Sequence, residues 1–287
     1  MLEFENVTYK YSENTPFEMT AVDGVSLKIQ DGIVTGLIGH TGSGKSTLSM
    51  MMNALVKPTS GRVLLDGKDI WEKGYDTLSV RYKVGLVFQY PEYQLFEETV
   101  EKDIAFGPKN MGLSEKEIKE RVLRAAEFTG LTEEMLQKSP FELSGGQKRR
   151  VAIAGSLAME PDILVLDEPA AGLDPKGKNE ILSHLCQYQK KRGNTLVVIS
   201  HSMEDIGLYA DRIVTLSHGK VLIEGTPAEV FKEYKLLSEN GLSVPQVTKI
   251  MGLLKEKGFC IDEAVYTPDD AVKAILDVVN KNLLSKK

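Results

Sequence analysis

Cysteine and long apolar runs are scarce in this sequence of 287 residues, and each scarcity excludes a class of protein. The two cysteines, Cys186 and Cys260, lie far apart and form no CxxC pair. Neither a disulfide framework nor a cysteine-based zinc site is therefore expected, which fits a reducing compartment. No apolar run approaches the roughly 18 residues that predict a membrane-spanning helix. We expect a globular chain that builds its core without disulfides or structural metal.

Positive charge is also not in excess. The 35 Lys and Arg residues are outnumbered by 41 Asp and Glu, which gives a net charge of −6. Proteins that wrap nucleic acid by bulk electrostatics usually carry a basic surplus, so no nucleic-acid partner is expected. Residues 1–5 are acidic where a secretory signal would be basic. This pattern favours a cytoplasmic location.

Apolar segments and helical patterns alternate along the chain in the order typical of an α/β fold. Alternation over residues 2–7 and 25–29 predicts an antiparallel β edge. The nearly continuous apolar run 33–38 predicts a strand buried on both faces. Two further runs, 163–166 and 196–199, are separated by a helix-length segment and indicate a parallel βαβ core.

Two stretches show helical periodicity instead. Residues from about 90 to 158 predict a helical subdomain inserted into the sheet domain, with a capping box that begins at Ser114. From Thr226 onward, capping signals at Thr226, Ser243 and Thr267 predict a small helical appendage. We therefore expect a domain over 1–227 and a C-terminal helical domain over 228–287.

A phosphate-binding pattern, G-x-x-x-x-G-K-S, lies between the apolar run 33–38 and the following helix. Its glycines let consecutive backbone N–H groups surround a phosphate, and the helix N-terminus adds partial positive charge. Lys45 is expected to reach the terminal phosphates, and Ser46 to ligate Mg²⁺. The predicted ATP-binding residues of this loop are Gly39, His40, Thr41, Gly42, Ser43, Gly44, Lys45, Ser46 and Thr47.

Two adjacent carboxylates, Asp167 and Glu168, end the apolar run 163–166. Neighbouring strand residues point to opposite sides, so the two acids can serve different purposes. Asp167 is expected to hold Mg²⁺ and Glu168 to polarise an attacking water. An acidic pair in a solvated loop is the alternative, and the phosphate loop in the same chain argues against it.

A second glycine-bearing helix start follows at residues 143–147. Its Ser and Gln form a capping-box pattern, and the glycines leave N–H groups open to a phosphate. Because one ATP fills the first loop, the second helix start most simply serves an ATP held by another subunit. A capped structural helix explains the same pattern. The residues are Leu143, Ser144, Gly145, Gly146 and Gln147.

These motifs, in this order, resemble the ATP-binding cassette (ABC) ATPases from residue 2 to about 230. The resemblance implies a P-loop NTPase fold of ABC type. Such a fold has a mixed sheet core, an antiparallel β edge, an inserted helical subdomain and here a small C-terminal helical appendage. It also implies a Mg²⁺-dependent ATP hydrolase that acts as a dimer.

The same resemblance assigns roles to four further residues. Gln89 would touch Mg²⁺ and water and sense a membrane partner, and His201 would contact the γ-phosphate. Asp174 would belong to a loop that crosses the dimer interface. Tyr11 would stack on adenine, with Tyr9 as its competitor. The alternatives are an ordinary strand-end glutamine, a surface or capping histidine and a core tyrosine.

The stretch 88–96, with residues 98–100 and 106–110, resembles the ATPase subunits of energy-coupling factor transporters, and the second type more than the first. Ala170 stands where many relatives have Thr. The resemblance implies a peripheral ATPase on the cytoplasmic face of the cell membrane that powers uptake of a vitamin or transition-metal ion. Its partners would be a second ABC ATPase, the same or homologous, a transmembrane coupling protein and a substrate-capturing membrane protein. The same resemblance implies that the C-terminal helical domain, residues 228–287, serves dimerisation of the two ATPases.

Aromatic and apolar residues crowd into the polar loop after Gln89, at Tyr90, Tyr93, Leu95 and Phe96. They predict a docking groove for the membrane subunit, and packing against the helical subdomain is the alternative.

Other functions fit the sequence less well. The ATPase of another ABC importer remains an alternative. A soluble ABC ATPase would normally carry a long coiled-coil insertion or two tandem cassettes, and a small-molecule kinase has no use for LSGGQ. A regulatory subunit would lack the acid at Glu168.

Overall fold

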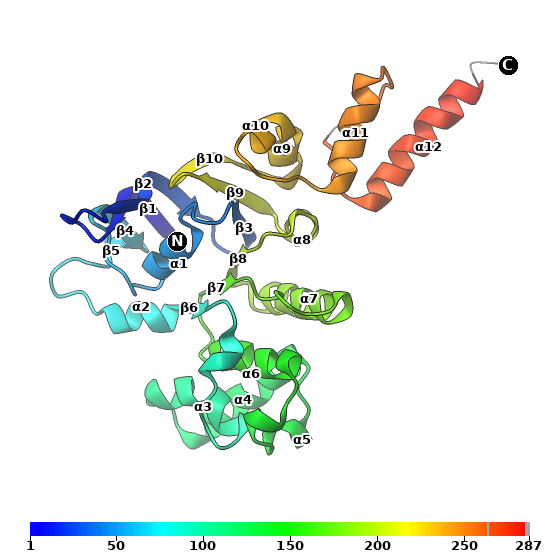
Figure 1. Ribbon diagram of the computed structural model, residues 1–287. Helices are drawn as coiled ribbons and strands as arrows, with labels where there is room; N and C mark the ends of the chain where they lie inside the picture. Colours follow the sequence, from blue (N-terminus) through cyan, green and yellow to red (C-terminus); the bar gives the residue numbers. More distant parts are fainter. Residues whose placement is uncertain (263, 285–287) are drawn as a thin grey trace.

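Two β-sheets make the centre of the computed structural model, which describes residues 1–262 and 264–284, with side chains to residue 279 (Figure 1). The first sheet is antiparallel, in the order β2-β1-β4-β5. The second has the order β10-β9-β3-β8-β7-β6. The strands are β1 (Leu2–Tyr11), β2 (Met19–Ile29), β3 (Val34–Gly39), β4 (Ser60–Leu65), β5 (Lys68–Asp69), β6 (Val84–Val87), β7 (Ile163–Asp167), β8 (Thr195–Ile199), β9 (Arg212–Ser217) and β10 (Lys220–Gly225).

The six-stranded sheet is parallel except at one edge, where β10 pairs antiparallel with β9. The predicted parallel core is thus confirmed, because β7 and β8 lie side by side in it. The predicted antiparallel edge also forms, as a sheet of its own. Its strands bury their apolar side chains against helix α1 (Lys45–Met52) and one face of the larger sheet.

Each face of the larger sheet has its own core. In β7, Ile163 and Val165 belong to the core shared with the antiparallel sheet and α1. Leu164 and Leu166 belong to the core on the opposite face, which most of the remaining helices cover. This alternation explains the unbroken apolar run in the sequence, since every residue of the strand is buried.

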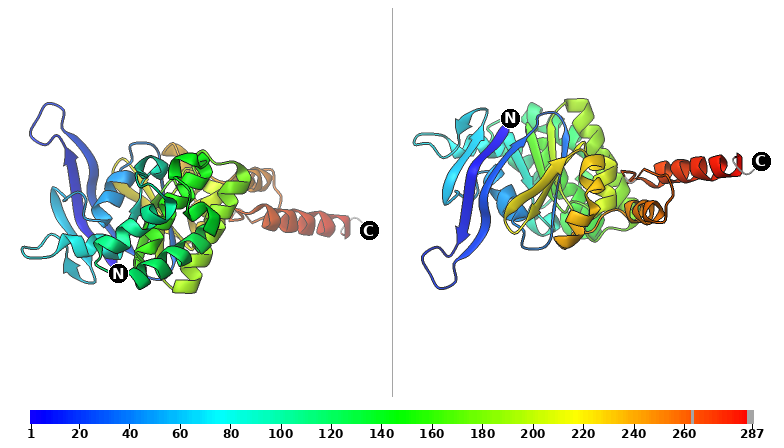
Figure 2. Two further views of the ribbon diagram at one scale, coloured as in Figure 1. Left: turned by 90° about the horizontal axis from the view of Figure 1, so that it is seen from below. Right: turned by 90° about the horizontal axis from the view of Figure 1, so that it is seen from above.

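The helices gather into a subdomain, a layer on the sheet and a tail (Figures 1 and 2). Among the described residues, no helix combines the length and apolarity needed to cross a bilayer. The remaining helices are α2 (Thr77–Lys83), η1 (Pro91–Gln94), α3 (Val100–Asn110), α4 (Glu115–Thr129), α5 (Glu133–Leu136), η2 (Pro140–Glu142), α6 (Gly145–Ala158), α7 (Pro175–Arg192), α8 (Met203–Tyr209), α9 (Pro227–Lys232), α10 (Tyr234–Glu239), α11 (Gln246–Glu256) and α12 (Pro268–Leu284).

The helix starts follow the capping signals with one exception. Capping boxes form at Ser114 and Thr226, and Thr267 exchanges hydrogen bonds with Asp270 at the start of α12. The box expected at Ser243 is wrong. Helix α11 starts at Gln246, and Pro245 occupies its N-cap, where it offers no side-chain acceptor.

The tail does not separate from the sheet domain at the expected boundary after residue 227. Val230 and Phe231 of α9 are fully buried, and together with Leu237 and Val244 they belong to the core beneath the sheet. Helix α12 instead points away from the body of the molecule (Figures 1 and 2). The core on this face of the sheet therefore includes residues beyond 227, and the partly buried Tyr266 also packs against it.

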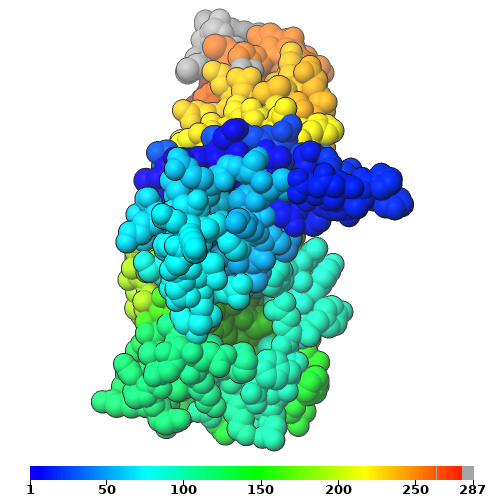
Figure 3. Space-filling model, turned by 90° about the vertical axis from the view of Figure 1, so that its left-hand side faces the viewer, coloured from blue at the N-terminus to red at the C-terminus, as the bar shows by residue number. Residues whose placement is uncertain are grey.

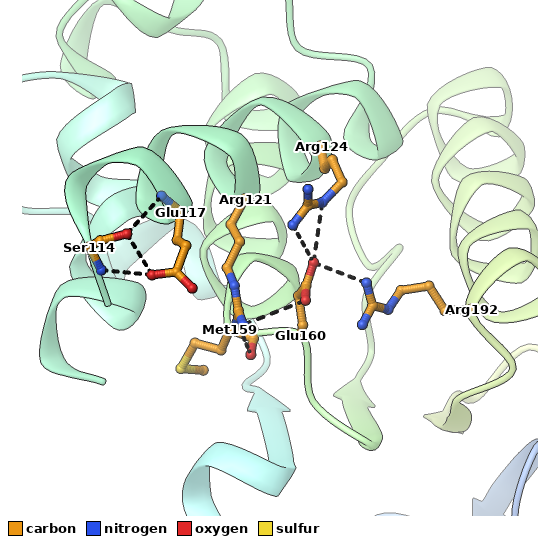
Figure 4. A network of polar contacts seen from close by, with 7 residues as sticks. All are labelled: Ser114, Glu117, Arg121, Arg124, Met159, Glu160 and Arg192. Atoms are coloured by element: carbon orange, nitrogen blue, oxygen red, sulfur yellow. Dashed lines mark hydrogen bonds and ion pairs between the residues drawn. The ribbon is translucent and has the colours of Figure 1, made fainter. Parts of the chain in front are cut away.

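Three arginines surround Glu160, in the turn between α6 and β7 (Figure 4). Arg124 and Arg192 approach its carboxylate to 2.9 and 3.0 Å, and Arg121 to 3.6 Å. Arg121 also donates a hydrogen bond to the Met159 carbonyl. Burial raises the pKa of Glu160, but the arginines lower it by more, so that it lies below its ordinary value of 4.5. The network ties α4 of the subdomain to the C-terminus of α7.

Replacing Glu160 with Gln should destabilise the fold by about 2 kcal/mol near neutral pH, because the three arginines lose the negative charge that they share. Since the folded-state pKa is depressed, this contribution is complete above the unfolded value of 4.5 and is lost as the pH falls through the folded value. Denaturant unfolding of both proteins across this range measures the effect. The difference should shrink in acid, and a difference that does not depend on pH would contradict the assignment. Glu134→Gln, which removes an exposed pair with Lys138, is the control and should change little.

Candidate functional site

The loop between β3 and α1 has the backbone that a phosphate cradle needs. Gly44 has a φ of 103°, and a Cβ added there would lie 2.4 Å from the Ala21 carbonyl oxygen, so only glycine fits. Gly42 also has a positive φ, and a Cβ on it would meet nothing within 4 Å, so the loop opens onto free space there. Ser43, between them, is buried, and its hydroxyl has no hydrogen-bond partner among the described residues. An anion fits such a cradle.

Lys45 reaches back across this loop. Its Nζ donates hydrogen bonds to the carbonyl oxygens of Gly39 and His40, at 2.7 and 3.0 Å. Burial lowers the pKa of Lys45, while the carboxylates of Glu168 and Asp167 act in the opposite direction. The ammonium group therefore lies among loop carbonyls, where its charge is only partly compensated.

The turn between β9 and β10 supports the loop from outside. The His218 ring lies 4.9 Å from the His40 ring, and the Gly219 N–H donates to the Ser43 carbonyl at 3.2 Å. The Gly219 carbonyl accepts in turn from the Asp23 N–H at 2.8 Å. The hairpin thus connects the loop to the antiparallel sheet.

Asp167 ends β7 with its side chain toward α1. It follows Ile163 and Val165 on the same face of the sheet, and its Oδ2 accepts a hydrogen bond from the Ser46 hydroxyl at 2.8 Å. Burial raises the pKa of Asp167, and the hydrogen bond from Ser46 and the charge of Lys45 oppose this. Two oxygen ligands of the kind that Mg²⁺ prefers are therefore adjacent.

Glu168 lies in a strained turn. Its φ of 52° is unusual for a residue with a side chain, and its N–H donates to the Ile199 carbonyl at 3.0 Å. Burial, followed by the neighbouring Asp167 charge, raises the pKa of Glu168 to about 7. Its Oε1 is buried without a hydrogen-bond partner among the described residues, and His201 Nε2 lies 3.5 Å from it. The carboxyl thus has unused capacity to accept a proton.

His201 and Gln89 follow strands at the same sheet edge. His201 comes after β8, with 54% of its side chain exposed, and burial lowers its pKa. Gln89 lies two residues beyond Val87, which pairs with Leu166 next to the acidic turn. Its side chain is exposed.

The structure separates the two candidate tyrosines. Tyr11 shares a hydrogen bond with the Thr47 hydroxyl at 3.0 Å, which places it over the first turn of α1. Tyr9 packs against the core between the sheets, and its ring meets the Tyr11 ring edge to face at 4.9 Å. Tyr11 is thus the tyrosine attached to the phosphate-loop helix.

The second glycine-bearing helix start has the predicted capping box. The Ser144 hydroxyl accepts from the Gln147 N–H, and the Gln147 amide oxygen accepts from the Ser144 N–H at 2.9 Å. Leu143 is buried beneath, while Ser144 and Gly145 are exposed. A Cβ added to Gly145 would meet nothing within 4 Å, so this helix end is open to an incoming group.

A hollow of about 480 Å³ lies beside this helix start, between α6 and α7. Its lining includes Ser144, Gly146, Leu173 and Asp174, and no residue of the phosphate loop. Asp174 caps α7 by accepting from the Gly177 N–H at 2.7 Å. The structure therefore gathers the phosphate loop with Asp167, Glu168 and His201, and it places the LSGGQ segment elsewhere.

A groove of about 680 Å³ runs between α2, α3 and α6. Figure 3 shows it as a recess between residues coloured cyan and teal, with green residues at its floor. Phe96 and Phe106 line it with their rings edge to face, and Leu78 of α2 lines it as well. Of the expected groove residues, Leu95 and Phe96 line it, whereas Tyr90 and Tyr93 stack on each other outside its lining. The aromatic spacing in the sequence could not distinguish the two pairs.

One polar cluster was not found from the sequence. Arg149 of α6 is buried and forms a two-pronged ion pair with Glu92 of η1. In the sequence it is one of two adjacent arginines and looks like part of a solvated helix face. Only the burial of its side chain in the folded chain distinguishes Arg149 from such a solvated residue.

Comparison with known proteins places these features in a family. Residues 22–171 match the family model described as ABC transporter. A curated relative from Clostridium tetani, named energy-coupling factor transporter ATP-binding protein EcfA2, is 54% identical over 97% of both chains. The protein of the same name from Clostridium perfringens is 50% identical over 98% of this chain and 99% of its own length.

Two solved structures share the fold. CbiO1 from Clostridium perfringens, described as part of the ABC transporter complex cbiONQ, has a TM-score of 0.74 and 40% identity over 88% of this chain and 98% of its own. The ATP-binding cassette MJ0796, described as dimeric and bound to ADP and Pi, has a TM-score of 0.71 and 31% identity. That match covers 79% of this chain and 98% of the other.

Proposed function

The chain belongs to the ABC transporter family, and from this premise we propose that it is the ATP-hydrolysing subunit of an energy-coupling factor importer. The observation that carries the proposal is the separation of two glycine-bearing helix starts. The phosphate loop lies beside Glu168, while the helix start at Ser144 opens into a hollow that the loop does not line. An ATP in the loop meets such a helix start only when another ATPase supplies it. Relatives named for this function support the choice of transporter.

ATP binding in the proposal uses the phosphate loop as a cradle. Lys45 exchanges its two carbonyl acceptors for terminal phosphate oxygens, which compensate its buried charge more fully. Backbone N–H groups from Gly42 to Ser46 surround the phosphates, and Tyr11 offers its ring to adenine.

Ser46 and Asp167 would hold Mg²⁺, with Gln89 as a further oxygen ligand from the same sheet edge. Their chemistry fits, because Mg²⁺ in such sites uses one or two carboxylates together with substrate phosphates. Across the described part of the chain, no group of three His, Cys, Asp or Glu residues is placed to hold a metal, so substrate oxygens are needed. When bound, Mg²⁺ would neutralise part of the negative charge on the phosphates.

Glu168 is the proposed general base. Its strained backbone holds the carboxyl at the edge of the site, and burial makes it a better proton acceptor than an exposed glutamate. His201, 3.5 Å away, orients Glu168 and reaches the γ-phosphate in the proposed complex. Hydrolysis then depends on how the reacting groups are positioned and on neutralisation of the negative charge on the phosphates, as in phosphoryl transfer generally.

A second ATPase, identical or homologous, completes each site. The N–H groups of Gly145 and Gly146 would act on the partner's nucleotide, and the segment at Asp174 would lie across the interface. ATP closes the pair, and hydrolysis reopens it.

The groove floored by α6 is the proposed contact with a transmembrane coupling protein. Phe96, Phe106 and Leu78 expose apolar surface there, beside the loop that carries Gln89. A substrate-capturing membrane protein would select the cargo, a vitamin or a transition-metal ion. The chain would then reside at the cytoplasmic face of the membrane.

The exposed apolar stripes of the tail are the proposed nucleotide-independent contact between ATPases. Val272, Leu276 and Val279 lie on one face of α12 and are 57%, 53% and 45% exposed. Ile250 and Leu253 of α11 are exposed as well. Surface of this kind is usually covered by a partner.

Glu168→Gln should keep ATP affinity, lower turnover by about a hundredfold or more and trap the ATP-bound pair, because the cradle stays intact while the base is lost. Nucleotide binding, phosphate release and light scattering measure the three effects. Lys45→Ala provides the contrast and should weaken binding itself. Wild-type turnover in the assembled Glu168→Gln complex would contradict the role.

Phe96→Asp should release the membrane subunit while ATP binding to the isolated chain persists, because a charge would enter the apolar groove. Co-purification with the membrane partners measures it. Tyr93→Asp is the matched control, since Tyr93 belongs to the same loop, is 85% exposed and does not line the groove. Equal loss with both variants would show that the loop, and not the groove, makes the contact.

Removal of residues 268–287 should abolish nucleotide-free association of the ATPases and leave ATP affinity unchanged. A cut at residue 227 would instead remove Val230 and Phe231 from the core. Leu276→Asp in the full chain should reproduce the effect, and Lys273→Ala should not. Unaltered pairing of the truncated chain would exclude this role.

A further inference from the structure

The guanidinium of Arg149 holds three segments at once. Its Nε and Nη2 donate to the two carboxylate oxygens of Glu92, at 3.1 and 2.8 Å, and its Nη1 donates to the Ala171 carbonyl. The Tyr90 ring lies 5.8 Å away. Helix α6, the loop after Gln89 and the turn after Glu168 therefore meet at one side chain.

Burial makes these contacts interdependent. The side chain of Arg149 is 3% exposed and that of Glu92 is 16% exposed. A buried charge that loses a partner is strongly destabilised, and the planar fork of arginine accepts only a narrow geometry. If Glu92 moves, Arg149 must either follow it or lose the ion pair with it. Either change disturbs the guanidinium group that donates to the Ala171 carbonyl.

The turn on the other side leads directly to the proposed base. The Ala171 N–H donates to the Glu168 carbonyl at 3.1 Å, and the Leu173 N–H donates to Ala170 at 3.3 Å. A shift of the Ala171 carbonyl thus acts on the short hydrogen-bonded turn that begins at Glu168. On the opposite side, Glu92 lies three residues before Leu95 at the groove.

We propose that Arg149 is a positioning residue that couples the groove loop, residues 90–96, to the turn at residues 168–173. Through Glu92 and Ala171, docking in the groove and the placement of Glu168 change together. The functional part rests on the proposed role as a transporter ATPase, whereas the mechanical link is a property of this chain alone.

Hydrogen exchange in the full-length chain tests the link without nucleotide or partner. Glu92→Gln should raise amide exchange both in 90–96 and at Ala171 and Leu173, which Glu92 does not touch. Arg149→Lys should do the same. Arg124→Gln removes an arginine ion pair elsewhere in the subdomain and should leave both segments unchanged. Faster exchange confined to 90–96 in Glu92→Gln would overturn the proposal.

Turnover in the assembled transporter tests the consequence. Arg149→Lys and Glu92→Gln should keep KM for ATP and lower kcat about tenfold, because misplacement of a catalytic group acts on the chemical step. The isolated chain should still bind ATP with unchanged affinity, which separates a positioning role from loss of the fold. If a variant shows faster amide exchange in both segments but an unchanged kcat in the assembled transporter, the functional part of the proposal would be overturned. Absence of turnover in the wild-type complex would contradict the proposed function instead, and the exchange result would still decide the link.

Discussion

The shared carboxyl edge of the parallel strands is the constraint on which the rest of the structure depends. Because β3, β6, β7 and β8 run in one direction, the phosphate loop, Gln89, the acidic turn and His201 all leave the sheet at the same edge. Alternation along β7 then directs Asp167 toward Ser46. A slip of one residue in β7 would exchange its two core faces, so burial of both faces fixes the register of the acids.

Incomplete compensation of charge gives this edge its chemistry. Burial disfavours the charged forms of Lys45, Asp167 and Glu168. The attraction between Lys45 and the two carboxylates opposes this only in part, and the charge of Asp167 further disfavours charged Glu168. Clusters of titratable groups shifted by burial and by one another are typical of functional sites. In the proposed complex, phosphate oxygens and a divalent cation would supply the opposite charges that these groups lack. The strained backbone at Glu168 is consistent with a position held for function.

Two polar networks attach the helical subdomain at opposite ends of α6. Beyond its C-terminus, Glu160 joins arginines of α4 and α7. Near its N-terminus, Arg149 joins η1 to the turn after Glu168. The capped helix start at Ser144 lies just before Arg149 in the chain. The capped helix start is therefore linked through Arg149 to both the groove loop and the turn that begins at Glu168.

The sequence by itself determined the features that arise from neighbouring residues. Short continuous apolar runs located β7 and β8, the glycine pattern located the phosphate loop, and three-residue spacing located the caps at Ser114 and Ser144, because strands, loops and caps form through local contacts. Only the tertiary structure decided that Arg149 is buried, that Phe96 rather than Tyr93 lines the groove, and that α9 belongs to the sheet domain. Burial depends on residues distant in the chain, and a local pattern does not record which of them will cover a given side chain.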